Sequence, residues 1–176
     1  MKRITPLAAV ILMCVAVGPR QVLSADDPQS PEGLKRLTED VLDKVKAGNT
    51  DAAMALIRPM RLPNADRWFV SVFGPEKGKL LAADYAEQAR TLDKDLLGLF
   101  SEQVKQSRTK VTAYKLESAG DPQATGAQVK ALTAMVTKVP LYGCRMVAPG
   151  AELGMHLWSF VWVDGQFRLA GKMRLP

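Results

Sequence analysis

Residues 155–174 read MHLWSFVWVDGQFRLAGKMR, two mostly apolar runs on either side of an Asp164-Gly165 pair. Valine and the aromatic residues are favoured in β-strands, so the pattern predicts one strand from Met155 to Val163 and another from Gln166 to Arg174. Asp-Gly between two such runs favours a two-residue type I′ turn, in which both central residues have positive φ. The stretch therefore predicts a β-hairpin that closes a sheet.

The turn also fixes which residues face each other across the hairpin. One predicted face pairs Trp162 with Phe167, Phe160 with Leu169, Trp158 with Gly171 and His156 with Met173. The other face pairs Val161 with Arg168, Leu157 with Lys172 and Met155 with Arg174. Because the second set carries the charges, the aromatic face is expected to look inward, and His156 with it.

The segment before the hairpin is also expected to contribute strands, because helix formers become rarer after Arg108. The sequence predicts strands at Thr109–Glu117 and Tyr142–Val147, with a loop from Ser118 to Gly126. Residues 128–139 fit a helix by the spacing of their apolar side chains. Their threonines and valines, and their position between strands, favour another strand instead.

The first half of the chain has helical spacing. Ser30 is suited to cap a helix that begins at Pro31, and apolar residues then recur at three- and four-residue steps: Leu34, Leu37, Val41 and Val45. Shorter helices are expected from Asn49 to Pro59 and from Pro63 to Gly74. Residues 78–107 predict one long helix or two helices separated by a bend.

Helices followed by an antiparallel sheet make an α+β fold, with the N-terminal helices packed on one face of a curved sheet. Two local patterns carry a resemblance to a known family. Residues 44–57, KVKAGNTDAAMALI, resemble the helix-turn-helix opening of the nuclear transport factor 2-like superfamily, a cystatin-like α+β group. Residues 160–170, FVWVDGQFRLA, resemble its closing hairpin.

The resemblance implies a cone-shaped domain whose sheet and helices enclose a pocket. It also implies a homodimer through the outer face of the sheet. The superfamily includes isomerases, hydrolases, ligand carriers and catalytically silent modules, so the resemblance alone does not specify the function.

The N-terminus has the layout of a bacterial-type secretory signal peptide. Lys2 and Arg3 precede an apolar run from Leu7 to Val17, and a small-residue end follows at Ser24-Ala25. We expect cleavage after Ala25, with a cut after Ser24 as the alternative. The run is shorter than the roughly 20 apolar residues that span a bilayer, so no stable membrane anchor is expected. Residues 26–30 are expected to be a flexible lead-in to a single domain at 31–176, exported to the periplasm or the outside of the cell.

Charge and cysteine content exclude some classes of protein. The full chain has a net charge of +6, and removing Lys2, Arg3 and Arg20 with the signal leaves +3. This is too mild to indicate a nucleic-acid partner. Cys144 is the one cysteine after processing, so no intramolecular disulfide is expected. It is interpreted as a buried small hydrophobe, with an exposed thiol that pairs two chains as the alternative.

Common catalytic and cofactor motifs are missing. Zinc sites usually draw on several histidines and cysteines, and the processed chain has one of each. Residues 74–79, GPEKGK, place three residues between the glycines where a phosphate-binding loop has four, and Leu80 follows. A serine hydrolase would need His156 and a G-x-S-x-G turn, which is absent. No metal and no cofactor are expected.

A few residues remain as candidates for a site. A Cys144–His156 pair on neighbouring strands is conceivable, although a strand-borne cysteine is usually packed. Acid–base chemistry in a pocket would use His156, Asp84 or Tyr85, each of which also has an ordinary structural interpretation. The residues predicted to line a pocket are His156, Trp158, Phe160, Trp162, Trp68 and Tyr85; the aromatic ones among them equally fit a filled core.

The sequence thus favours an exported binding or interaction module without catalytic activity, with a small apolar ligand as its candidate partner. A small-molecule isomerase or hydrolase with a pocket beneath the sheet is the enzymatic alternative. A purely structural dimer module is the third.

Overall fold

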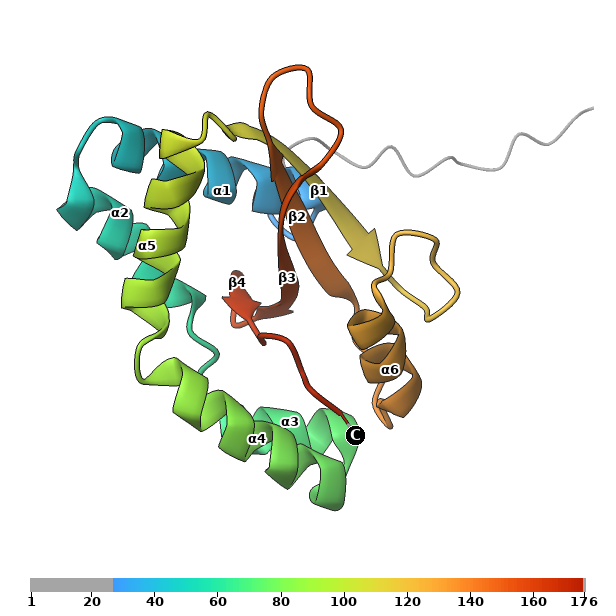
Figure 1. Cartoon of the computed structure of the whole chain (residues 1–176). Helices are drawn as coiled ribbons and strands as arrows, with labels where there is room; N and C mark the ends of the chain where they lie inside the picture. Colours follow the sequence, from blue (N-terminus) through green and yellow to red (C-terminus); the bar gives the residue numbers. More distant parts are fainter. Residues whose placement is uncertain (1–26, 176) are drawn as a thin grey trace, which may run out of the picture.

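The computed structural model describes residues 27–175, apart from the side chain of Trp158. The predicted signal peptide lies outside these residues. The elements in chain order are α1 (Pro31–Lys46), α2 (Thr50–Ile57), η1 (Arg58–Met60, a 3₁₀ turn), α3 (Ala65–Phe73), α4 (Pro75–Ala89), α5 (Leu92–Lys105), β1 (Lys110–Leu116), α6 (Gly126–Ala134), β2 (Leu141–Val147), β3 (Gly154–Val163) and β4 (Gln166–Leu169). The α+β class predicted from the sequence is confirmed (Figure 1).

The first helix begins at its predicted cap, Ser30, and the second is capped by Asn49, the first residue of its predicted range. The Ser30 hydroxyl accepts a hydrogen bond from the Gly33 N–H at 3.1 Å, and the Asn49 side chain accepts one from the Ala52 N–H at 3.0 Å. Such bonds satisfy N–H groups that have no partner inside the helix, which stabilises the helix start by about 1 kcal/mol.

The segment before α1 is a hydrogen-bonded turn, where the sequence predicts a flexible lead-in. Ser30 Oγ donates to the Asp27 carbonyl at 2.6 Å, and the Tyr142 hydroxyl donates to the Gln29 carbonyl at 3.2 Å. Gly33 makes this close approach feasible, since a Cβ there would lie 2.2 Å from the Pro28 carbonyl oxygen. Residues 27–30 are therefore anchored to both α1 and the sheet.

The long helical stretch after Gly74 is two helices, which resolves one of the two sequence alternatives. The chain leaves α4 at Arg90, and α5 restarts after Thr91, whose carbonyl accepts the Asp95 N–H at 2.9 Å. The break lets α4 pack with α3 and α5 pack with α1 and α2.

The strand predicted at residues 128–139 is wrong, because residues 126–134 form the helix α6. Its start is a reciprocal capping box: Thr125 Oγ1 accepts the Gln128 N–H at 3.3 Å, and the Gln128 side chain accepts the Thr125 N–H at 3.0 Å. The helix buries Ala131 and Leu132. β-Branched residues disfavour a helix by less than about 1 kcal/mol each, so capping and burial outweigh them.

The sheet is antiparallel with the order β1-β2-β3-β4. The closing hairpin has the predicted register near its turn, with Trp162 opposite Phe167 and Phe160 opposite Leu169. Asp164 and Gly165 have φ values of 51° and 72°, as a type I′ turn requires.

The second hairpin strand is shorter than predicted. β4 ends at Leu169, and Gly171 then takes a φ of 75°, which is incompatible with a continuing strand. The predicted pairs Trp158–Gly171, Leu157–Lys172, His156–Met173 and Met155–Arg174 are consequently not formed.

A bulge in β3 reverses the alternation of its side chains. Tyr142 pairs with Phe160 and Gly143 pairs with Trp158, so Ser159 is an extra residue on β3. An extra residue shifts the period-two pattern by one position. Met155 and Leu157 therefore share a face with Phe160 and Trp162, whereas His156 lies on the opposite face; the prediction that His156 shares the inward aromatic face is wrong.

Apolar clusters cover both faces of the sheet. On one face, α1, α2 and α5 pack on residues that include Cys144, Phe160 and Phe167. On the other, α3, α4 and α6 pack around Leu116, Leu141 and Val161 at one end of the sheet. Helices thus cover part of the outer face as well, beyond the single covered face expected from the sequence. In Figure 1, α1 crosses the sheet while α3 and α4 lie together at one end of the molecule.

Candidate functional site

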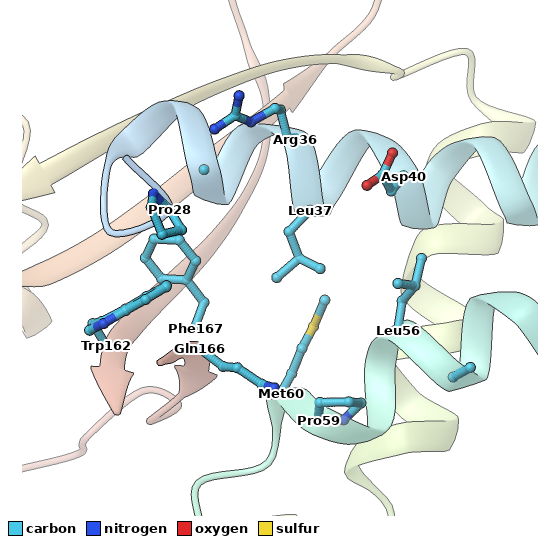
Figure 2. Close-up of a pocket in the computed structure, with 12 residues that line it drawn as sticks. Pro28, Arg36, Leu37, Asp40, Leu56, Pro59, Met60, Trp162, Gln166 and Phe167 are labelled. Atoms are coloured by element: carbon cyan, nitrogen blue, oxygen red, sulfur yellow. The ribbon is translucent and has the colours of Figure 1, made fainter. Parts of the chain in front are cut away.

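A pocket opens between α1, the α2–η1 segment and the closing hairpin (Figure 2). Its volume is about 430 Å³. The lining residues are Pro28, Gly33, Arg36, Leu37, Asp40, Ala55, Leu56, Pro59, Met60, Trp162, Gln166 and Phe167. The first helices of the chain and the closing hairpin, which are distant in sequence, therefore build one site.

The spacing of α1 explains its contribution. Gly33, Leu37 and Asp40 recur at three- and four-residue steps and lie on one side of the helix. The neighbouring stripe, with Leu34 and Val41, is fully buried in the core. The pocket stripe thus borders the core stripe, and Leu37 is only partly covered.

The aromatic wall comes from the hairpin. Trp162 and Phe167 face each other across the turn with ring centroids 4.9 Å apart and an interplanar angle of 75°. Tyr142 packs edge-on against Phe167 from below, at 5.1 Å. Such edge-to-face contacts are worth about 1 kcal/mol each beyond burial, so the wall is held in place from behind.

The opposite wall is tied to the hairpin through Arg168. Its guanidinium donates to the Pro59 carbonyl and, at 3.5 Å, to the Arg61 carbonyl. Arg61 and Leu169 also form a parallel bridge. Met60, which is 1% exposed, is thereby positioned at the floor of the pocket. These contacts make the pocket a preformed feature.

Charged groups lie at the rim. Figure 2 shows Leu37 and Met60 pointing toward each other across the pocket, while Arg36 and Asp40 extend from α1 above them. Both charged residues are exposed. The floor and walls can therefore make apolar contacts, and the rim can make polar ones.

The structure does not bring together the six residues predicted to line a pocket. Trp162 lines the pocket described above, whereas Phe160 is fully buried in the core beneath it. Trp68 and Tyr85 belong to the cluster on the other face, where Trp68 packs edge-on against Phe69 at 5.0 Å. His156 lines a separate groove. The side chain of Trp158 is outside the described part of the structure.

The other acid–base candidates have structural partners. The Tyr85 hydroxyl accepts the Leu62 N–H at 2.7 Å, and burial raises the pKa of Tyr85. Asp84 accepts a hydrogen bond from the Gln88 amide at 2.7 Å. The hydrogen bond of Tyr85 thus joins the segment after η1 to α4. The hydrogen bond of Asp84 stays within α4, because Gln88 lies one turn further along the same helix.

A Cys144–His156 dyad is excluded by the strand geometry. Cys144 pairs with Leu157, and its side chain is fully buried against α1, where Thr38 donates to the sulfur at 3.6 Å. Burial raises the pKa of this thiol to about 11. His156 pairs with Arg145 on the other face, and burial together with the charge of Arg145 lowers the pKa of the imidazole. Cys144 is a buried apolar residue, as predicted.

The sequence analysis missed most of the pocket, including Arg36, Asp40, Leu56, Met60 and Gln166. The helical spacing places Leu37 on the same face as Leu34 and Val41, without indicating that it stays partly uncovered. One signal is present in the sequence: Leu34, Leu37 and Val41 form an apolar stripe that is wide enough to contact two different surfaces. Which part of it stays uncovered depends on tertiary packing.

Within residues 27–175, no group of three metal-ligating side chains comes together. Over the same residues, no helix is both long and apolar enough to cross a membrane.

Comparison with known proteins gave no match. No protein-family model matches the chain, and neither the curated proteins nor the solved structures contain a significantly similar one.

Proposed function

We propose that this protein is an exported, non-catalytic binding module that holds a small apolar ligand between α1, the α2–η1 segment and the closing hairpin. The observation that carries the proposal is a preformed pocket of about 430 Å³ with apolar walls from three elements and charged groups at the rim. Ligand pockets typically have volumes of roughly 300–1,000 Å³ and combine apolar walls with a few polar groups.

The walls favour a ligand with an aromatic or branched apolar body. Leu37, Leu56 and Met60 offer flexible aliphatic contacts, and Trp162 offers a flat one. Methionine adapts its shape easily, which suits a pocket that accepts related ligands. Arg36 and Asp40, which are also lining residues, can then orient a polar end of the ligand at the mouth.

The distribution of titratable groups supports binding rather than turnover. The ionisable side chains that line the pocket are Arg36 and Asp40, both exposed on α1. General acid–base catalysis needs such a group within hydrogen-bond reach of the reacting atom. The walls beneath the rim are formed largely by apolar side chains.

The proposal of export rests on the sequence pattern of residues 1–25. A basic start, an apolar run and a small-residue end are the features that direct secretion. We propose that the module acts after this segment has been removed.

The experiment uses N-phenylnaphthylamine, a neutral apolar dye whose fluorescence rises in apolar surroundings. We expect saturable binding to one site. Ala55→Trp places an indole at the pocket wall and should weaken dye binding by about tenfold or more, equivalent to about 1.4 kcal/mol.

Ala86→Trp is the matched control, because Ala86 is an exposed alanine of α4 that lines none of the described pockets. Its dye affinity should equal that of the unmodified protein. Equal weakening by both variants, or no saturable binding by the unmodified protein, would overturn the proposal.

A further inference from the structure

One stretch of β3 has a strand partner on a single side. β3 pairs with β2 from Gly154 to Phe160, but β4 pairs with it only from Phe160 to Val163. The last backbone bond between the two chain segments runs from the Ala170 N–H to the Ser159 carbonyl, at 2.9 Å. Among the described residues, no strand lies beside the outer edge of Gly154–Trp158 (Figure 1).

A groove follows this edge. Its volume is about 620 Å³, and its lining residues are Gln88, Leu99, Thr125, Gly154, Met155, His156, Leu157, Leu169, Gly171 and Lys172. One of these residues is Gly171, where the chain turns away after β4 with a φ of 75°. The turn at Gly171 thus leaves both an edge without a strand partner and the space beside it.

The two sides of the groove differ in chemistry because of the bulge in β3. Met155 and Leu157 lie on the side of α5, where Leu99 and Leu169 complete an apolar wall. His156 lies on the opposite side, directly across from Arg145 on β2. A strand added here would place every second side chain on the apolar side of the groove and the others on the side of His156 and Arg145.

The basic side has unmet hydrogen-bonding capacity. Arg145 Nε and His156 Nδ1 are buried, and neither has a hydrogen-bond partner among the described residues. Leaving such an atom unpaired is unfavourable. None of the described residues that line the groove is acidic. His156 lines the groove, and Arg145 lies directly across from it on β2, behind the lining. This side of the groove is therefore complementary to a carboxylate.

The opposite edge of the sheet looks different. β1 carries Lys110 and Lys115, and Lys115 forms an ion pair with Glu117 at 2.6 Å. Proteins prevent an edge strand from pairing with other chains by placing charged residues on it, above all lysine. The edge of β3 from Gly154 to Trp158 has no lysine and no proline.

We propose that an extended segment of a partner polypeptide adds a strand beside Gly154–Trp158, placing apolar side chains against Met155 and Leu157 and acidic side chains near Arg145 and His156. An edge of this length, at about 3.4 Å per residue, matches roughly five residues of the partner. Backbone hydrogen bonds supply affinity in this mode of recognition, and the alternating side chains supply specificity. The groove is separate from the proposed ligand pocket, so neither proposal depends on the other.

The test compares three synthetic peptides of about seven residues. The first alternates valine and glutamate, the second alternates valine and lysine, and the third is the first with N-methyl groups on alternate residues, which removes one row of backbone donors. By NMR titration the first should bind with a Kd below about 1 mM, and the other two at least tenfold more weakly. Amide hydrogen exchange should slow for one or more residues of 154–158 when the first peptide is added.

Arg145→Gln should weaken binding of the first peptide by about fivefold or more, in the range for loss of a partly buried charged hydrogen bond. Arg67→Gln is the control, since Arg67 is an exposed arginine on α3, and it should leave the affinity unchanged. The peptide comparison uses the unmodified protein, so it stands even if Arg145→Gln fails to fold. Equal binding of the N-methylated peptide, or absence of binding by the first peptide, overturns the proposal. Slow exchange at the same amides caused by self-association, without peptide, overturns it as well, because a second copy of the chain then occupies the edge.

Discussion

Arg61 Nε donates to Asp93 Oδ1 over 2.7 Å and thereby joins the segment after η1 to the first turn of α5. This hydrogen bond raises the pKa of the Arg61 guanidinium. Together with the Arg168 bonds to the Pro59 and Arg61 carbonyls, it attaches one wall of the ligand pocket to two other parts of the fold. The pocket shape therefore depends on contacts made outside the pocket.

Asp93→Asn should lower the free energy of unfolding by roughly 0.5 kcal/mol, because the Arg61 side chain is 42% exposed and solvent screens the pair. Urea denaturation measures the change. Glu87→Gln removes an ion pair in which both side chains are largely exposed, and it should leave the midpoint unchanged. A larger loss in the control than in Asp93→Asn would contradict a specific role for the Arg61–Asp93 pair.

Gly165→Val should destabilise the closing hairpin by about 1–3 kcal/mol, since a β-branched residue is strained at the φ of 72° found there. Thermal denaturation followed by circular dichroism gives the loss. Gly165→Asn is the comparison, because asparagine tolerates positive φ, and this variant should lose much less stability. If valine and asparagine behave alike, backbone strain is not what the glycine relieves.

Cys144 predicts a specific dependence of stability on pH. Its pKa of about 11 in the folded state lies above the ordinary thiol value of 9.0, so the folded protein keeps the proton that the unfolded chain loses. This stabilisation is complete below about pH 9 and is lost as the pH rises towards 11 and beyond; the difference reaches about 3 kcal/mol, on the basis of 1.36 kcal/mol per pKa unit.

Other groups titrate in the same range, including tyrosines whose pKa is raised by burial. The measurement is therefore the difference between the unmodified protein and Cys144→Ala in urea denaturation at several pH values. The difference in the free energy of unfolding between the two proteins should narrow as the pH rises from 9 to 11. A constant gap would mean that the thiol ionises equally easily in both states.

Local signals in the sequence were sufficient for much of the fold. The caps at Ser30 and Asn49 and the Asp164-Gly165 turn act through bonds or φ values within a few residues. The capping box at Thr125 and Gln128 is equally local, and it outweighs the neighbouring β-branched residues that favour a strand.

The bulge at Ser159 and the early end of β4 depend on distant contacts, and no local sequence pattern predicts them. Together they move His156 to the other face and leave the edge of β3 without a strand partner. The ligand pocket is also nonlocal: it exists because α1 presents a stripe wider than the core needs, and because η1 is attached to the hairpin. A sequence read element by element cannot show which part of such a stripe remains uncovered.

The most direct test of the ligand pocket is an NMR titration of the methionine-methyl-labelled protein with N-phenylnaphthylamine. Met60 lies at the floor of the pocket, whereas Met135 is buried in the cluster on the other face of the sheet. We predict that the Met60 methyl and the Trp162 indole N–H shift together, saturably and with one dissociation constant, while the Met135 methyl stays in place. Saturable shifts at Met135 with none at Met60 would contradict the proposed site.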